Sequence, residues 1–379
     1  MPSSWPWRYW INSENMAKTI FFSVGDSSAD LHASNIVLSL KGMDGDIKVC
    51  SAGGSRLKSV SDEFLYDIAG LDVHGYYEPF RQYFRLRDVF FGKIIPFLKN
   101  KKPDMVVLAD YYGFNIRVAE AAKELGIPVY YFISPQVWAT RPGRIWKIKK
   151  YVDRMLVIFP FEEQIYRDAG IPVTFVGHPL LDILPRGSGV EERGRERVRI
   201  GLFPGSRKQV IKWNLPVLLE SAELIGRQIS GAEFSIMGIS TLKGCYGNSV
   251  NVVYDAGYED RRNLDLALST SGTVTLENAL LKIPMIVMYR LPALMYFIIK
   301  SMARVSQISI VNLIAGRPVI PEFIQDKAEP RKIADLAAEW LGDPGKTAEI
   351  REEYARLPAL LGNGGAVEKA AKIIAEGIS

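Results

Sequence analysis

The chain has 379 residues, of which 48% are hydrophobic and 23% are charged, and its net charge is +5. Length and composition are typical of a globular protein with two or three domains. The charge suits an anionic ligand or an anionic membrane surface, but it is too weak and too dispersed to favour nucleic acid. The two cysteines, Cys50 and Cys245, lie far apart and form no metal-type pair. We therefore interpret them as core thiols in a reducing compartment.

Residues 1–15 contain tryptophans but no apolar run long enough for a signal peptide. Met16 stands directly before the residues that predict the first strand. We interpret residues 1–15 as an N-terminal extension and Met16 as a candidate for the true start, so the first domain is expected to begin at residue 16.

Strands and helices alternate from residue 18 onwards. Apolar runs predict strands at residues 19–24, 47–52, 105–109, 129–133, 155–159 and 173–176. A polar turn at residues 25–30 leads into a helix that carries His32, and Asp110 follows the third strand. The pattern predicts a doubly wound sheet, in which ligands bind beyond the carboxyl ends of the strands.

A segment rich in glycine and charge at residues 187–197 predicts a linker, after which the pattern restarts. Further strands are predicted at residues 198–203, 233–237, 252–254, 266–268 and 285–288, with helices from residue 328 onwards. We expect two Rossmann-like doubly wound domains, at residues 16–186 and 198–379, that face each other across a cleft. This α/β arrangement resembles the GT-B fold of nucleotide-sugar glycosyltransferases, in which the last helix often crosses back to the first domain.

Residues 265–289 predict a strand, a turn of small residues, a helix and another strand. A helix that begins in this turn offers free N–H groups and a positive dipole end, which bind a phosphate or diphosphate. Glu277, about one turn further along, could reach the hydroxyls of a sugar. The alternative is an ordinary helix that is capped by Ser271 or Thr273.

Two segments have alternative, lipid-binding interpretations. The basic helix predicted at residues 141–150 is interpreted as a solvated face, with contact to anionic lipid headgroups as the alternative. The apolar segment at residues 294–305 is interpreted as a buried helix, with an exposed patch for acyl chains as the alternative. The apolar run is far shorter than the roughly 20 residues that a membrane span needs.

Seven motifs occur in an order that resembles the lipid-A-disaccharide synthase family. They begin at Ser134, Arg141, Pro160, Phe175, Pro204, Ser271 and Asn312, and they read SPQVWA, RPGR, PFE, FVGHPL, PGSR, SGTVTLE and NLIAGR. The resemblance runs from about residue 21 to residue 325. The segments around Trp138 and His178 are specific to the family rather than to the fold.

The resemblance implies transfer of 2,3-diacylglucosamine from its UDP ester to the 6-hydroxyl of 2,3-diacylglucosamine 1-phosphate (lipid X). Transfer would proceed with inversion and give a β-1,6 disaccharide 1-phosphate and UDP, as a step of lipid A and lipopolysaccharide synthesis in Gram-negative bacteria. The family implies no metal or other cofactor and no nucleic acid. It also implies peripheral association with the cytoplasmic face of the inner membrane, and it leaves a homodimer open.

Inverting transfer needs a general base for the acceptor hydroxyl and positive groups for the leaving diphosphate. Within the resemblance, Asp110 is the candidate base. His32 and His178 are catalytic candidates that would hydrogen-bond the sugar or phosphate, with a structural role as the alternative. The UDP-binding candidates are Ser206, Arg207, Ser271, Gly272, Thr273 and Glu277. The candidates for the acceptor and lipid side are Asp30, Asn115, Trp138, Phe161, Asn312 and Arg317, with core packing as the alternative for the two aromatic residues.

The chain departs from the family pattern at several positions. Asp26 and Ala29 stand where the family usually has Glu and Gly, Gly113 replaces a second aspartate, and Val210 replaces Glu. The donor side is therefore the better preserved half. The departures keep two alternatives open: another UDP-sugar GT-B enzyme with a different lipid acceptor, and a non-catalytic UDP-sugar binder. A UDP-N-acetylglucosamine epimerase is disfavoured by the Trp138 and His178 segments.

Overall fold

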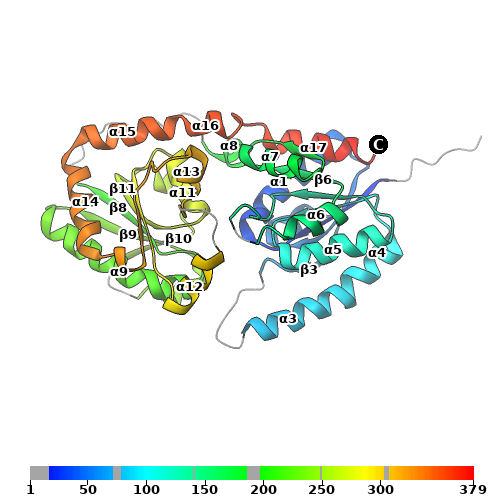
Figure 1. The fold of residues 1–379 in the computed structure, drawn as a ribbon, viewed down its shortest axis with the longest axis horizontal. Coiled ribbons are helices and arrows are strands. Elements are labelled where there is room, and N and C mark those ends of the chain that lie inside the picture. Colours follow the sequence, from blue (N-terminus) through cyan, green and yellow to red (C-terminus); the bar gives the residue numbers. More distant parts are fainter. Residues whose placement is uncertain (1–16, 71–77, 140, 186–196, 248–249, 303–306) are drawn as a thin grey trace, which may run out of the picture.

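The computed structural model describes residues 17–70, 78–139, 141–185, 197–247, 250–302 and 307–379. The predicted extension at residues 1–15, Met16 and most of the predicted linker lie outside the described residues. Figure 1 shows two α/β domains side by side, each built around a sheet of parallel strands.

The described part of the first domain contains a sheet with the strand order β3-β2-β1-β4-β5-β6-β7. The strands are β1 (Thr19–Val24), β2 (Lys48–Gly53), β3 (Glu63–Asp67), β4 (Met105–Ala109), β5 (Val129–Phe132), β6 (Arg154–Val157) and β7 (Val173–Phe175). In register, Phe22 of β1 lies between Ser51 of β2 and Val107 of β4. The strand order changes direction between β1 and β4, which is where ligands bind in open parallel sheets.

The central strands are buried on both faces of this sheet. Ile20 and Phe22 belong to one apolar core and Phe21 to the other. Successive side chains of a strand point to opposite faces, so a strand covered by helices on both sides is apolar throughout. This is why β1 and β4 read as continuous apolar runs in the sequence.

The second domain has a sheet with the order β10-β9-β8-β11-β12-β13. Its strands are β8 (Arg199–Phe203), β9 (Glu233–Gly238), β10 (Asn251–Tyr254), β11 (Leu266–Thr270), β12 (Met285–Tyr289) and β13 (Glu322–Ile324). The change of direction lies between β8 and β11. The turns that follow these two strands lead into α9 (Lys208–Gln228) and α11 (Thr273–Leu280).

The remaining helices connect and cover the strands. In the first domain they are α1 (Ser27–Met43), α2 (Ser55–Val60), α3 (Glu78–Val89), the π-helix η1 (Phe90–Ile94), α4 (Ile95–Lys101), α5 (Tyr112–Glu124), α6 (Arg144–Tyr151), α7 (Pro160–Asp168) and α8 (Leu180–Ile183). Later in the chain they are η2 (Ser240–Cys245), α10 (Tyr258–Arg261), α12 (Ala293–Met302), α13 (Ile310–Ala315), η3 (Gln325–Lys327), α14 (Pro330–Gly342), α15 (Pro344–Ala355), α16 (Leu357–Leu360) and α17 (Ala366–Glu376).

The last helix, α17, lies on the first domain, where it packs against α1 (Figure 1). The carboxylate of Asp182 accepts hydrogen bonds from the backbone N–H groups of Gly365 at 2.5 Å and Val367 at 2.8 Å. Lys369 Nζ donates to the carbonyl oxygen of Phe175 at 2.6 Å. The C-terminal helices therefore form a second connection between the two domains.

The predicted strands agree with the structure to within two residues at each end. Strands β3 and β13 were not predicted, because β3 mixes acidic residues with apolar ones and β13 has only three residues. The interpretation of residues 294–305 as a buried helix is wrong. Helix α12 leaves the side chains of Leu294 and Phe297 75% and 67% exposed.

Candidate active site

A cavity of about 520 Å³ lies between the two domains, where the carboxyl ends of both sheets approach each other. Its lining includes Asp26, His32, Asp110, Glu162 and His178 from the first domain and Arg207, Gly272, Thr273 and Ile310 from the second. The structure therefore brings together six of the predicted site residues: His32, Asp110, His178, Arg207, Gly272 and Thr273. Asp110, Arg207 and the start of α11 follow strands at which the sheet order changes direction. His32 lies on the helix after β1, and His178 follows the edge strand β7.

Asp110 stands in a strained turn directly after β4. Its φ is 47° and that of Tyr111 is 48°, a left-handed conformation that is uncommon for residues other than glycine. Asn115 Nδ2 and Tyr131 Oη both donate to the carbonyl oxygen of Asp110, at 2.8 Å and 2.5 Å. Asn115 was predicted for the acceptor side, and in the structure it holds the backbone of Asp110. These buried hydrogen bonds fix the turn that presents the carboxyl group.

The carboxyl group of Asp110 has an unusual pKa. Burial and, to a smaller extent, the nearby carboxylate of Asp26 raise the pKa of Asp110 to about 6, while a backbone hydrogen bond and the charge of Arg207 oppose the rise. Such a carboxylate is ionised near neutral pH but remains basic enough to accept a proton from a hydroxyl group. This property suits a general base.

Glycine at position 25 allows the turns that carry Asp26 and Asp110 to lie close together. A Cβ atom on Gly25 would lie 2.3 Å from Cδ1 of Tyr111, a clash with the ring itself. Only glycine, which has no Cβ, lets the Tyr111 ring pack against this turn. Replacing Gly25 would therefore displace the turn of Asp110.

His32 and His178 are both buried and neutral. Their ring centroids are 6.3 Å apart, in an edge-to-face arrangement. Burial lowers the pKa of His32 to about 4, with a further contribution from Arg56, and burial together with His32 lowers the pKa of His178 to about 3. His178 Nδ1 accepts the N–H of Leu180 at 3.2 Å, which assigns the proton of the neutral ring to Nε2. His178 is therefore a hydrogen-bond donor rather than a cation.

Glu162 forms a buried polar cluster in the cavity wall. Its Oε1 accepts hydrogen bonds from Ser134 Oγ at 2.5 Å and Trp138 Nε1 at 3.2 Å, and its Oε2 accepts the N–H of Phe159 at 3.3 Å. Burial raises the pKa of Glu162 to about 7, although these hydrogen bonds oppose the rise. The ring of Phe161 packs edge-to-face on Trp138 at 5.1 Å. Both predicted lipid-side aromatics thus support this cluster.

Arg207 faces the cavity from the second domain, at the residue that precedes α9. The turn before it contains Gly205, whose φ is 106°, and a Cβ there would lie 2.7 Å from Cγ1 of Val210. Glycine therefore permits the tight turn between β8 and α9. The result is an exposed guanidinium group at the mouth of the cavity.

The N-terminus of α11 also faces the cavity, through Gly272 and Thr273. Gly272 is the N-cap residue, and no side chain in the described part of the chain caps this end. Ser271 Oγ donates instead to the carbonyl oxygen of Ile308 at 2.7 Å. The interpretation that Ser271 or Thr273 caps the helix is therefore wrong. The backbone N–H groups of the first turn remain available for an anion.

Glu277 lies on α11 but does not line the cavity. Its Oε2 pairs with Arg261 Nη1 at 2.5 Å, and both side chains are only 17% exposed. The ion pair with Arg261 fixes the orientation of the Glu277 carboxylate. A contact between this carboxylate and a sugar hydroxyl remains a prediction.

Four other predicted residues lie outside the cavity lining, and three of them make structural contacts. The carboxylate of Asp30 accepts three backbone N–H groups at the start of α2. Asn312 is buried and bonds to backbone groups and to Glu322. Arg317 pairs with Glu353, and Ser206 is exposed beside Arg207. Their assignments to the substrate remain predictions.

Tyr112, Arg144 and Glu162 are among the residues that line the cavity but were not predicted as site residues. Glu162 stands at the third position of a helix that begins with Pro160, a pattern that predicts N-terminal capping rather than a cavity wall. Arg144 was assigned to the solvated face of the basic helix. Its guanidinium carbon lies 4.5 Å from the ring centroid of Tyr112, a contact that links α6 to α5.

Comparison with known proteins shows the family of the chain. The profile of a family described as lipid-A-disaccharide synthetase matches residues 20–376. The chain belongs to the lipid-A-disaccharide synthetase family. The lipid-A-disaccharide synthases of Geobacter metallireducens and Syntrophus aciditrophicus are each 37% identical to it. The matches cover 95% of this chain and 97% of the Geobacter protein, and 94% and 96% for the Syntrophus protein. As a member of this family, the chain is a glycosyltransferase.

Solved structures with the same fold include enzymes and complexes that contain UDP. A UDP complex of MnaA from S. aureus has a TM-score of 0.67 at 11% identity and covers 94% of this chain and 96% of its own. MurG from Acinetobacter baumannii has a TM-score of 0.60 at 14% identity, with 95% and 99% coverage. These low identities speak for the fold alone, and they confirm the GT-B prediction for this member of the synthetase family.

Proposed function

We propose that the chain joins 2,3-diacylglucosamine from its UDP ester to the 6-hydroxyl of 2,3-diacylglucosamine 1-phosphate. The observation that carries this proposal is a cavity, in a chain of this family, that has a carboxylate on one wall and a cation with a helix N-terminus on the other. Asp110, a half-buried carboxylate with a raised pKa, lines one wall. Arg207 and the start of α11 line the other, and these groups suit a diphosphate.

The proposed reaction is a single displacement with inversion at C1 of the donor sugar. The acceptor oxygen forms a bond to C1 while the bond between C1 and the diphosphate oxygen breaks. The hydroxyl proton passes to the carboxylate of Asp110, and UDP leaves with the bonding electron pair. His178 Nε2, as a neutral donor, is suited to hold a sugar or phosphate oxygen without adding charge. His32 Nδ1 is buried without a partner among the described residues and has the same capacity.

The leaving diphosphate would be stabilised from the second domain. Arg207 supplies a positive charge, and the uncapped first turn of α11 supplies N–H groups and the positive end of the helix dipole. Charge that develops on the leaving group is thereby stabilised without a metal ion in the proposed mechanism. Glu277 on the ribose completes the proposal, with Arg261 orienting its carboxylate.

We also propose peripheral contact with the cytoplasmic face of the inner membrane. Helix α12 exposes Leu294, Met295, Phe297, Ile298 and Ile299, and α3 exposes Tyr83 and Phe84. Figure 1 shows α3 and α12 on the same, lower side of the two domains. Within the described ranges, the helices are too short or too polar to cross a bilayer. Apolar patches of this kind suit an acylated substrate that is drawn from a membrane surface.

The direct test supplies the purified protein with UDP-2,3-diacylglucosamine and 2,3-diacylglucosamine 1-phosphate in detergent. UDP and disaccharide are followed together, and the anomeric configuration of the new linkage is determined by NMR. The proposal predicts equal amounts of UDP and a β-1,6 disaccharide over many turnovers. Binding of UDP without disaccharide would reject this acceptor, and an α linkage would reject the inverting mechanism.

The membrane proposal is tested by sedimentation with anionic vesicles. The double variant Leu294→Ser, Phe297→Ser should lower the bound fraction several-fold, because it removes apolar surface that would insert between lipids. Leu38→Ser is the matched control, because Leu38 is 56% exposed on α1 and belongs to neither apolar segment. An equal loss of binding in both variants would contradict a specific role for α12.

A further inference from the structure

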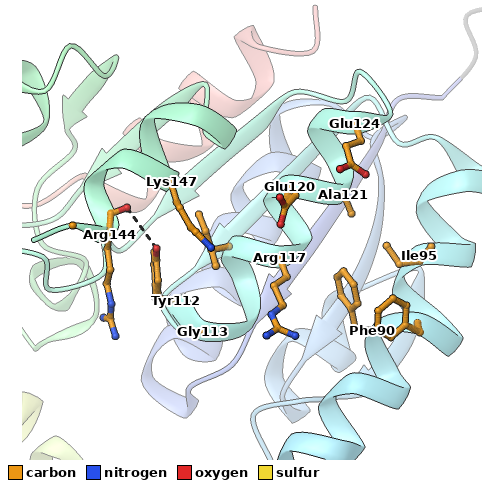
Figure 2. Close-up of a pocket in the computed structure, with 13 residues that line it drawn as sticks. Phe90, Ile95, Tyr112, Gly113, Arg117, Glu120, Ala121, Glu124, Arg144 and Lys147 are labelled. Carbon is orange, nitrogen blue, oxygen red and sulfur yellow. Dashed lines mark hydrogen bonds between the residues drawn. The ribbon is translucent and has the colours of Figure 1, made fainter. Parts of the chain in front are cut away.

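A second hollow of about 840 Å³ opens beside the candidate active site, between η1 and α5 (Figure 2). Its volume falls within the roughly 300–1,000 Å³ of typical small-molecule sites. Apolar side chains line one part of it: Phe90, Phe91, Ile95, Ile116 and Ala121. Arg117, Arg144 and Lys147 line another part, so the groove combines an apolar wall with positive charge.

The groove is continuous with the cavity that contains Asp110. Tyr112, Gly113 and Arg144 line both hollows. Tyr112 and Arg144 form the partition, since Tyr112 Oη donates to the carbonyl oxygen of Arg144 at 3.5 Å and the guanidinium group lies over the ring (Figure 2). At Gly113, a Cβ atom would meet nothing within 4 Å. A molecule could therefore extend from the cavity into the groove past Gly113.

The apolar wall is built around a π-helical turn. Phe90 is buried against Phe114, with ring centroids 6.1 Å apart, whereas its neighbour Phe91 is 62% exposed. The two rings meet edge-to-face at 5.1 Å. Turns of this kind are rare and often occur at functional sites. Here the turn anchors one ring in the core and leaves the next ring at the edge of the groove.

We propose that this groove binds the acceptor lipid, with an acyl chain on the Phe91 side and the phosphate at Arg144 and Lys147. The inference rests on the proposed function, because it assigns the substrate that must meet Asp110. An acylated sugar phosphate has both parts that the groove complements: an apolar chain and a dianionic group. Two acidic residues, Glu120 and Glu124, also line the groove, and Tyr151 Oη donates to Glu120 at 2.5 Å. The carboxylates disfavour phosphate near Tyr151, at the C-terminal end of α6, and so direct it toward Arg144 at the start of that helix.

The test uses two variants on the whole chain and a set of acceptors with long or short acyl chains. Phe91→Asp should raise the KM for the long-chain acceptor about tenfold or more, because the bound acyl chain no longer buries an aromatic side chain. It should leave the KM for the short-chain acceptor and the affinity for UDP unchanged. Lys147→Glu should raise the KM about tenfold for acceptors of either chain length, because it acts on the phosphate.

Matched controls come from residues outside the groove lining. Leu38→Asp changes an exposed apolar residue on α1, and Lys149→Glu reverses a charge on the same helix as Lys147. Neither should change the KM for any acceptor. Equal effects in variant and control, or an unchanged long-chain KM in Phe91→Asp, would overturn the proposal. Binding of Phe91→Asp to phosphatidylglycerol vesicles is measured without acceptor. If vesicle binding falls by the same factor as the KM rises, the groove binds bulk lipid rather than the acceptor, and the proposal is overturned.

A binding measurement separates failure of this inference from failure of the proposed function. Equilibrium binding of short-chain 2,3-diacylglucosamine 1-phosphate is measured without donor, for the unmodified protein and for Lys147→Glu. Loss of affinity in the variant supports the groove even if no disaccharide forms. If the unmodified protein turns over but both proteins bind the acceptor equally well, the proposed function is supported and the groove is rejected as the acceptor site.

Discussion

The two walls of the cavity use different physical means. The wall from the first domain contains buried or half-buried side chains whose pKa values depart from their usual range: those of Asp110 and Glu162 are raised, and those of His32 and His178 are lowered. The wall from the second domain presents the exposed guanidinium group of Arg207 and backbone N–H groups at the start of α11.

The difference indicates that the two domains have separate roles in the proposed reaction. Burial raises the pKa of a carboxylate and so makes it a better proton acceptor. Burial disfavours the charged form of a cation, which is the form that has to bind a diphosphate. Arg207 remains near solvent, where its charge costs little to keep, and it becomes desolvated only when an anionic ligand binds. The first domain is thus suited to the acceptor hydroxyl and the second to the leaving group.

The largest effect is expected from Asp110→Asn. The amide keeps the shape of the side chain but cannot accept the hydroxyl proton, so kcat should fall about 100-fold to 10,000-fold. UDP affinity should be unchanged or slightly tighter, because a negative charge near the diphosphate is removed. Initial rates and UDP titrations on the same preparation check both parts. Retention of more than a tenth of the activity would rule out Asp110 as the base.

Arg207→Ala should have a smaller effect and act on the other substrate. Loss of a charge-assisted hydrogen bond of about 1.5–3 kcal/mol corresponds to UDP binding that is weaker by about tenfold to a hundredfold. Lys208→Ala is the control, because Lys208 is the next cation along the chain and does not line the cavity. If both variants bound UDP equally well, diphosphate binding by Arg207 would be excluded.

The smallest effect concerns pH. Below pH 6 the carboxyl of Asp110 becomes protonated, so kcat/KM should fall as the pH decreases through that value. Asp26→Asn removes a negative charge that raises the pKa of Asp110, and asparagine still caps α1. The acidic limb of the profile should therefore move to lower pH by a fraction of a unit. A shift to higher pH would contradict the assigned coupling between the two carboxylates.

The sequence predicted the parallel sheets well because buried strands such as β1 and β4 are apolar at every position. It also predicted Asp110 and Arg207, since both follow strands at which ligands bind in this class of fold. The exposure of α12 was not predictable, because an apolar helix has the same composition whether a domain or a lipid surface covers it. The buried environment of Glu162 could not be predicted either, because its position in the sequence indicates only the start of a helix.

Three-dimensional contacts also decide which predicted residues face the cavity. Asp30 and Asn312 occur in matching segments, yet their polar atoms satisfy backbone groups of distant loops. Their partners are at least seven residues away along the chain, so no local pattern reveals them. The same holds for the pairing of Glu277 with Arg261. Such contacts separate a structural polar residue from one that is free to meet a substrate.

The most direct test of the division between the two walls is calorimetric titration of UDP into Asp110→Asn and Arg207→Ala side by side. Asp110→Asn is expected to bind UDP at least as tightly as the unmodified protein while making almost no product. Arg207→Ala is expected to bind UDP at least tenfold more weakly. Equal weakening of UDP binding in both variants would show that the two walls do not act separately, and it would contradict the central claim.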